Sequence, residues 1–187
     1  MARSEKTSKL VLTALMLCLV LLATFSIRIP APFTQGYVHL GDAFIFISVL
    51  LLGKKNGAIA AGMGSAMADL LGGYAAYAPW TLIIKFLMAF IMGMFVEVSM
   101  KRKKNFVKIV GVPLVQVIGM IIAGAIMVAG YALVDGVFAG NMLAGFLGIP
   151  FNIIQFGVGI VIALIIAATL YKTPAKKMFA YRIDNIE

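Results

Sequence analysis

The sequence predicts an all-α integral membrane protein, a bundle of six transmembrane helices with both termini in the cytoplasm. Apolar residues make up 63% of the chain and the mean hydropathy is +1.05, whereas about half of a soluble domain is apolar. The 187 residues suffice for about six spans of ~20 residues with short connections. Most basic residues lie in these connections, which argues against a nucleic-acid-binding surface. We expect a single domain, 1–187, with no soluble module attached.

The six spans are expected at 9–27, 40–52, 56–71, 79–100, 106–134 and 149–171. A basic segment precedes the first span, as in a signal peptide. No clear small-residue cleavage site follows and the run is long enough to span, so we interpret it as a helix. The second run has only 13 residues, which cover about 20 Å of a hydrocarbon core of ~30 Å. Either this helix starts inside the membrane or the preceding loop, 28–39, dips in to meet it.

Small residues, aromatic residues and prolines predict the arrangement of the other spans. The third run is rich in Gly, Ala and Ser, which let helix backbones approach closely in lipid, so it should be central. The fourth follows a loop with three aromatic residues, typical of a membrane interface. Pro113 is expected to kink the fifth span. The glycine-containing segment 135–150 is expected to be a loop with a short helix.

The basic residues predict the orientation. If successive spans alternate in direction, 14 of the 16 Lys and Arg residues fall on the side of the N-terminus. Arg28 falls on the far side, and Lys85 lies within a span. Cytoplasmic loops carry an excess of Lys and Arg, so the side of the N-terminus is expected to be the cytoplasm.

Several polar residues fall at the opposite, outer end of the spans. Asp42, Asp69 and Lys85 all lie toward that end if the runs are antiparallel. Asn152 and Gln155 fall at the outer start of the sixth span. Ionisable residues within apolar spans are costly and usually mark a functional site or a buried pair. Together these residues predict a polar pocket that faces outward.

The same residues also have structural interpretations. Asp69 and Lys85 could form an ion pair that joins the third and fourth spans. Asp42 could cap the start of the second span, where a carboxylate meets free backbone N–H groups. His39 could be an interfacial loop residue rather than a ligand contact.

The sequence offers no catalytic set. The glycine-rich stretch 57–65 lacks the lysine of a P-loop. A single histidine and a single cysteine leave no zinc motif and no disulfide within the chain. An intramembrane enzyme would need a nucleophile or a metal set, and neither is evident. We expect no enzymatic activity, no metal and no cofactor.

Four motifs carry a resemblance to a known family. They are GDAF at 41–44, LLGKKNGA at 51–58, GSAMADLLGGY at 64–74 and PWTLIIK at 79–85. These motifs resemble the membrane-embedded S components of energy-coupling factor (ECF) transporters, particularly the riboflavin-type group and its relatives for pyridoxine or hydroxymethylpyrimidine. The similarity in length and six-helix layout covers the whole chain, whereas the specific motifs cover 39–85.

The resemblance implies a function and a set of partners. An S component is a multi-pass protein of the prokaryotic plasma membrane that captures a small water-soluble vitamin or precursor from outside. It delivers the vitamin through a transmembrane coupling protein and two cytoplasmic ATPases, which form an ABC-type importer. The first candidate substrates here are pyridoxine and hydroxymethylpyrimidine, followed by riboflavin. In the family, the loop corresponding to 28–39 gates the pocket. Docking uses an A-x-x-x-A pattern, which here reads Ala14 to Cys18, with cysteine in place of the second alanine.

Aromatic residues near the polar end, with Phe33 and Tyr37 among them, suit a small hydroxylated aromatic heterocycle. The expected substrate-binding residues are His39, Asp42, Asp69, Tyr74, Tyr77, Trp80, Lys85, Asn152 and Gln155. The alternative is a self-sufficient secondary transporter or channel for a small polar solute. That alternative predicts inverted internal repeats with broken helices, and no convincing repeat is evident.

Overall fold

The computed structural model describes residues 2–31, 36–102 and 107–179. Within these residues, five helices are long and apolar enough to cross a membrane. The elements are α1 (Ala2–Ser26), β1 (Arg28–Pro30), β2 (Tyr37–His39), α2 (Gly41–Gly72), α3 (Ala78–Arg102), β3 (Lys108–Ile109), β4 (Val112–Pro113), α4 (Leu114–Phe138), α5 (Met142–Tyr171) and a 3-10 helix (Pro174–Met178).

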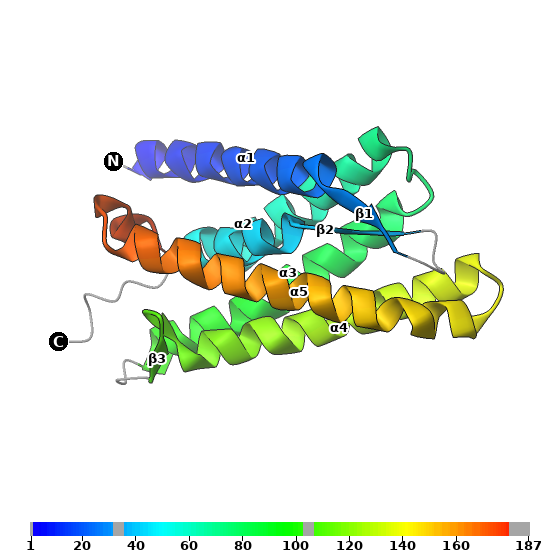
Figure 1. Cartoon of the computed structure of the whole chain (residues 1–187). Coiled ribbons are helices and arrows are strands. Elements are labelled where there is room, and N and C mark those ends of the chain that lie inside the picture. Colours follow the sequence, from blue (N-terminus) through cyan, green and yellow to red (C-terminus); the bar gives the residue numbers. More distant parts are fainter. Residues whose placement is uncertain (1, 32–35, 103–106, 180–187) are drawn as a thin grey trace.

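The long helices pack into one bundle (Figure 1). The start of α1 and the end of α5 lie at the same end of the bundle. The hairpin of β1 and β2 lies toward the opposite end, as does the turn between α4 and α5. The two strands pair antiparallel, with Arg28 opposite His39 and Pro30 opposite Tyr37. The structure is therefore a helical bundle with the start of α1 and the end of α5 at one end and the β1–β2 hairpin toward the other.

Helix α2 folds back on itself at Gly53. This residue has φ 74° and ψ −171°, a backbone conformation that glycine adopts without the steric penalty of a Cβ. A Cβ on Gly57 would lie 2.8 Å from the Cα of Val49, although residues eight apart in a straight helix are about 12 Å apart. The two expected runs, 40–52 and 56–71, are thus two halves of one element that pack antiparallel.

The turn between α4 and α5 is tighter than the loop expected at 135–150. Helix α4 continues to Phe138, and α5 begins at Met142, so Pro150 lies inside a helix. Gly140 has φ 63°, and the Asn141 side chain accepts a hydrogen bond from the backbone N of Leu143 at 2.9 Å, which caps α5. The glycines that suggested a loop instead permit close helix packing, because a Cβ on Gly145 would collide with the carbonyl of Ala132.

The expected fifth span, 106–134, also begins differently in the structure. The short strands β3 and β4 occupy 108–113, and α4 begins only at Leu114. Pro113 is the residue before the helix, so it does not kink a helix as expected. Proline is tolerated at this position, because a residue at the start of a helix does not need to donate a backbone hydrogen bond.

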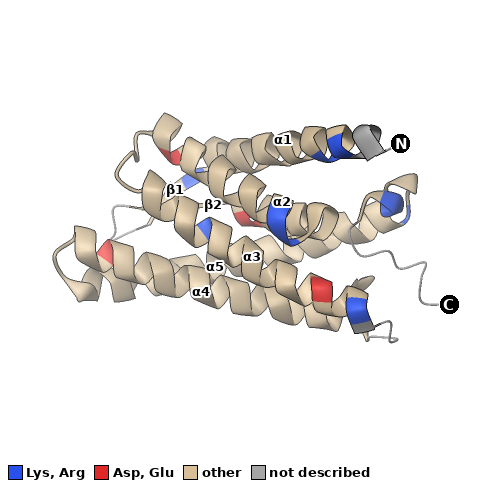
Figure 2. Cartoon of the chain, turned by 180° about the vertical axis from the view of Figure 1, so that it is seen from behind, with Lys and Arg blue, Asp and Glu red and all other residues tan. Residues whose placement is uncertain are grey.

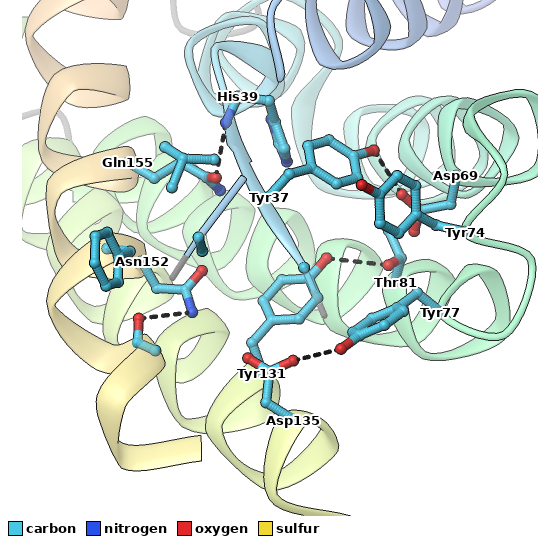
Figure 3. A pocket seen from close by; sticks show the side chains of 15 residues that line it. Tyr37, His39, Asp69, Tyr74, Tyr77, Thr81, Tyr131, Asp135, Asn152 and Gln155 are labelled. Carbon is cyan, nitrogen blue, oxygen red and sulfur yellow. Dashed lines mark hydrogen bonds between the residues drawn. The ribbon is translucent and has the colours of Figure 1, made fainter. Parts of the chain in front are cut away.

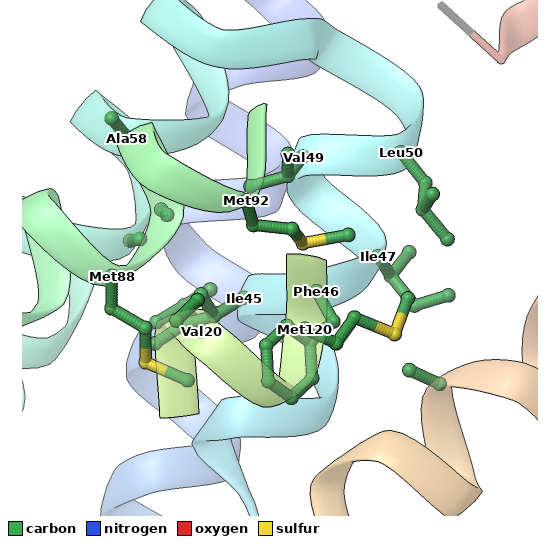
Figure 4. Packing of buried hydrophobic residues seen from close by; sticks show 14 of the residues in the cluster. Val20, Ile45, Phe46, Ile47, Val49, Leu50, Ala58, Met88, Met92 and Met120 are labelled. Atoms are coloured by element: carbon green, nitrogen blue, oxygen red, sulfur yellow. The ribbon is translucent and has the colours of Figure 1, made fainter. Parts of the chain in front are cut away.

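The centre of the bundle is a tightly packed apolar core (Figure 4). Phe46 from α2, Met88 and Met92 from α3, and Met120 from α4 have no exposed surface. Val20 extends this core to α1. Flexible methionine side chains fill irregular gaps between helices. The core therefore provides a fixed base for the polar residues at the hairpin end.

Charged residues divide between the two ends (Figure 2). Basic residues gather at the end that holds the start of α1 and the fold-back of α2. At this end Lys54 forms an ion pair with Glu97 at 2.9 Å. This ion pair joins the fold-back of α2 to α3, shortly before the basic turn 101–104. Lys103 and Lys104 of that turn lie outside the described residues.

Candidate functional site

A cavity lies beneath the β1–β2 hairpin, at the end of the bundle away from most of the basic residues (Figure 3). It encloses only about 40 Å³, room for about one water molecule. The lining residues come from the hairpin and from helices α2 to α5 and their connections. They are Ala31, Gly36, Tyr37, Val38, His39, Asp69, Tyr74, Tyr77, Thr81, Tyr131, Asp135, Gly148, Phe151, Asn152 and Gln155.

Four tyrosines form much of the wall of the cavity. The ring centroids of Tyr37 and Tyr74 are 4.7 Å apart with a tilt of 49°, and those of Tyr74 and Tyr77 are 6.4 Å apart and nearly perpendicular. The hydroxyl of Tyr131 donates to Oγ1 of Thr81 at 3.1 Å. The wall therefore offers aromatic faces with hydroxyl groups at their edges, a combination suited to stacking and orienting a ring.

Two carboxylates reach the cavity between the tyrosines. Tyr37 donates to Oδ1 of Asp69 at 2.7 Å, and Tyr77 donates to Oδ1 of Asp135 at 2.8 Å. Both aspartates are buried, with 4% and 5% of their surface exposed. Neither forms an ion pair within the described part of the chain. The hydroxyl of Thr81 also interacts with Asp69. Like the two tyrosine hydroxyls, it carries no charge.

A second polar cluster lies beside the cavity. Lys85 pairs with Oδ1 of Asp42, and both side chains are completely buried. The amide of Gln155 donates to Oδ2 of Asp42 at 2.9 Å. A Cβ on Gly159 would lie 3.0 Å from the Cβ of Asp42. The glycine thus lets α5 approach close to the start of α2.

This cluster corrects two interpretations of the sequence. The partner of Lys85 is Asp42, whereas one interpretation of the sequence paired Lys85 with Asp69. Asp69 instead lies at the end of α2 and bonds to the hairpin through Tyr37. Asp42 does not cap its helix, because the N-cap residue is Leu40 and no side-chain cap bond forms there. The carboxylate of Asp42 is occupied by Lys85 and Gln155 instead.

His39 joins the hairpin to this cluster. Its backbone N donates to Oε1 of Gln155 at 3.1 Å, and its Nδ1 accepts from the backbone N of Gly41 at 3.0 Å. Burial, together with the positive charge of Lys85, lowers the pKa of His39 to about 3. The imidazole is therefore neutral at physiological pH, with its proton on Nε2. His39 contributes a neutral donor to the lining of the cavity.

The structure brings most of the expected site residues together. The residues that line the cavity are His39, Asp69, Tyr74, Tyr77, Asn152 and Gln155. Asp42 and Lys85 lie beside it without lining it. Trp80 is 46% exposed and does not line the cavity. Its neighbour Thr81 faces the cavity instead, because successive residues of a helix point about 100° apart.

Four lining residues were not among the expected substrate-binding residues: Thr81, Tyr131, Asp135 and Tyr37, of which only Tyr37 was noted as an aromatic residue near the polar end. Tyr131 precedes Asp135 by four positions, so both lie on one face of α4. That spacing within an apolar span is the signal that could have identified Tyr131. Part of the expected gating loop, 32–35, lies outside the described residues, and Phe33 is within it.

The expected docking residues lie on the outside of the bundle. Ala14 and Cys18 are both exposed on α1. Residues four apart share one face of a helix. Only 17% of the most apolar window of α1 is buried, compared with 56% for α2. Helix α1 therefore presents most of its apolar surface outward.

Comparisons with known proteins identify the family. The family model described as ECF-type riboflavin transporter, S component, matches residues 4–172. A similar protein is the thiamine precursor transporter HmpT of Lactococcus lactis subsp. cremoris (strain MG1363), 26% identical over 91% of this chain and 92% of that protein. An uncharacterized protein of Pyrococcus woesei is 36% identical over 65% of this chain and 74% of its own length.

A solved structure, that of the S component of a bacterial ECF transporter, has the same fold. The two structures align with a TM-score of 0.65 at 17% identity, over 89% of this chain and 97% of the other. The family match extends well beyond the motifs at 39–85 and confirms the resemblance. This chain belongs to the ECF-type riboflavin transporter S component family.

Proposed function

We propose that this S component captures a single-ring aromatic vitamin or vitamin precursor in the cavity beneath the hairpin. S components are multi-pass proteins of the cell membrane and are transporter subunits rather than enzymes, as the sequence predicted. The observation that carries the substrate proposal is the set of four tyrosines interleaved with Asp69 and Asp135 around one cavity. Aromatic faces stack on a heterocycle, and a few polar groups fix its orientation.

The substrate proposal favours a small ring over a flavin. HmpT, which is similar over nearly the whole chain, is named as a thiamine precursor transporter. The cavity holds about 40 Å³, far below the ~300 Å³ at the lower end of ligand pockets. A single pyrimidine or pyridine ring requires less expansion than the three fused rings of riboflavin. Hydroxymethylpyrimidine and pyridoxine are therefore the first candidates, with riboflavin after them.

We propose that the β1–β2 hairpin opens to admit the substrate. The contacts that hold it closed include the packing of the Tyr37 ring against Tyr74 and three hydrogen bonds: Tyr37 to Asp69, His39 to Gln155, and Arg28 Nη1 to the carbonyl of Gly72 at 3.0 Å. Each contributes about 1 kcal/mol net, so opening is compatible with rapid binding.

The proposed topology has six spans, with the two halves of α2 counted separately, and both termini in the cytoplasm. The segregation of basic residues supports this orientation. A membrane-impermeant thiol reagent should label Ala76→Cys in whole cells but leave Asn105→Cys unlabelled, both in a Cys18→Ala background. The reverse labelling pattern would move the cavity to the cytoplasmic side.

We propose that α1 docks on the transmembrane coupling protein of an ECF module with two cytoplasmic ATPases. Small exposed residues at Ala14 and Cys18 support this, because they permit close contact between helices in lipid. Replacing Ala14 with Trp should abolish ATP-driven uptake and leave substrate binding unchanged. A parallel loss of binding would assign this face to the internal fold.

The decisive experiment is mass spectrometry of small molecules that co-purify with the full chain, followed by calorimetry with each candidate. A single-ring vitamin or precursor that binds with submicromolar affinity is the expected result. Uptake into vesicles with and without the ATPases then distinguishes an ECF subunit from a self-sufficient transporter. Uptake that proceeds without any ATPase would overturn the proposed coupling.

A further inference from the structure

Two of the three carboxyl groups at or beside the cavity have no ion-pair partner among the described residues. Of the three aspartates near it, Asp42 is paired with Lys85. Asp69 and Asp135 are nearly as buried but have no ion pair among the described residues. Each accepts a hydrogen bond from a tyrosine hydroxyl, which is neutral.

The basic side chains near these aspartates form their hydrogen bonds and ion pairs with other groups. Lys85 bonds to Asp42, and Arg28 donates to the carbonyl of Gly72 with its guanidinium 4.6 Å from the ring centre of Phe25. His39 is neutral, because its Nδ1 accepts a hydrogen bond and its pKa lies far below physiological pH. Lys85 and Arg28 act on Asp69 only through space, and within the described residues no basic side chain forms an ion pair with Asp69 or Asp135.

Both carboxylates retain acceptor capacity toward the cavity. An ionised carboxylate has about four acceptor positions; Tyr37 and Thr81 occupy two on Asp69, and Tyr77 occupies one on Asp135. Burial of a charged group that is incompletely paired is unfavourable. A ligand that brings positive charge or N–H donors would relieve this cost, whereas an anionic ligand would increase it.

From these observations we infer that the ligand is an aromatic heterocycle with a cationic or amine-bearing edge, which donates to Asp69 or Asp135 while its ring stacks among the tyrosines. This inference rests on the proposed function and narrows its substrate class. It disfavours vitamins that carry a free carboxylate or phosphate, and it ranks a neutral flavin below an aminated ring.

Matched ligands that differ in one group test the inference. Pyridoxamine and pyridoxine differ by an amine in place of a hydroxyl. 4-Amino-5-hydroxymethyl-2-methylpyrimidine and its 4-hydroxy counterpart form a second such pair. Calorimetry on the purified full chain should show that the amine-bearing member of at least one pair binds about 10-fold or more tightly, the usual strength of a hydrogen bond to a charged group.

Variants of the cavity residues test whether the carboxylates cause the preference for the amine-bearing ligand. Asp69→Asn and Asp135→Asn remove charge with little change of shape, and at least one should bring the affinity ratio of the pair close to one. Tyr77→Phe removes a hydroxyl from the same wall without removing charge, and it should preserve the ratio. Binding of the neutral ligand by each variant shows that the variant is folded.

The outcomes separate this inference from the proposed function. If a neutral ring such as pyridoxine or riboflavin binds more tightly than every amine-bearing ligand, the inference fails and the vitamin-binding function stands. If the amine preference survives in both Asp variants, the inference also fails, because the carboxylates are not its source. If no heterocycle of the panel binds the wild-type chain, the proposed function and this inference fail together.

Discussion

The buried aspartates of this protein fall into two regions with different surroundings. Asp42 has a lysine and a glutamine on its carboxylate and no exposed surface. Asp69 and Asp135 line the cavity, and they accept hydrogen bonds from phenols. The same side chain is therefore paired with a lysine in one region and has no ion-pair partner among the described residues in the other. Asp42 thus joins helices α2, α3 and α5, whereas Asp69 and Asp135 face the cavity, where we propose that a ligand binds.

The largest expected effect is on stability, and it comes from breaking the ion pair of Asp42 and Lys85. Lys85→Met leaves the carboxylate of Asp42 buried without its cation, which should lower the free energy of unfolding by about 3–5 kcal/mol. The double variant Asp42→Asn, Lys85→Met should recover part of this loss, because it strands no charge. Thermal unfolding in detergent measures both. Equal stability of the wild type and the single variant would show that the pair is not structural.

The second expected effect concerns ligand binding at the cavity, where the aspartates have no ion-pair partner among the described residues. Asp69→Asn should weaken binding of an amine-bearing ligand by about 10- to 100-fold, as loss of a charged hydrogen bond does. The melting temperature should change little, because no opposite charge is stranded. Asn152→Ala is a suitable control, since it removes a polar group from the same cavity without altering charge. If Asp69→Asn mainly lowered stability, Asp69 would resemble Asp42 and the distinction would fail.

The third prediction uses pH to sharpen the comparison at His39, which lies between the two regions. Its pKa is lowered from 6.5 to about 3 in the folded chain, so between these values the unfolded chain binds more protons. Stability from this residue is present above pH 6.5 and decreases as the pH falls toward 3. The free energy of unfolding should be about 2 kcal/mol lower at pH 5 than at pH 7.

Chemical denaturation at several pH values tests this expectation, with His39→Gln as the control. Glutamine cannot titrate, so the variant should show a shallower dependence in this window. Lys85 and Asp42 are the charged groups that act on His39. An identical pH dependence in the variant would assign the effect to the aspartates instead.

The smallest expected effect concerns the link between Asp69 and the hairpin. Tyr37→Phe removes one hydrogen bond of about 1 kcal/mol, which should make ligand association several-fold faster by favouring the open hairpin. Stopped-flow measurements give the association rate. Arg28→Gln provides a comparison at a second hairpin contact, the hydrogen bond to the carbonyl of Gly72. Slower association in Tyr37→Phe would mean that Tyr37 guides the ligand rather than holding the hairpin closed.

The sequence predicted the parts of the fold that depend on hydropathy and turn chemistry. Runs of apolar residues mark the helices, and Gly53 with its lysines marks the fold-back of α2. The expected loop at 135–150 was wrong, because glycine serves both turns and close helix contacts. Trp80 was also wrong as a cavity residue, because an aromatic side chain at a helix start suits the membrane interface equally well.

The pairing within the site could not be predicted from the sequence. Asp42 and Asp69 lie at the same end of the bundle, and the choice of Lys85 between them depends on the register of packed helices. The close approach at Gly159 sets part of that register, and it is a tertiary property. Tyr131 was missed for a related reason, since an apolar span does not itself reveal which face meets the cavity.

The fold-back at Gly53 has a consequence for biosynthesis. The first half of α2, from Gly41 to Leu52, has 12 residues and is about 18 Å long, too short to cross a hydrocarbon core of ~30 Å alone. Its natural route into the bilayer is as a hairpin together with the second half. Asp42 leaves the ribosome 43 residues ahead of Lys85. The nascent chain must therefore accommodate an acidic group in or near the membrane until α3 brings its counter-ion.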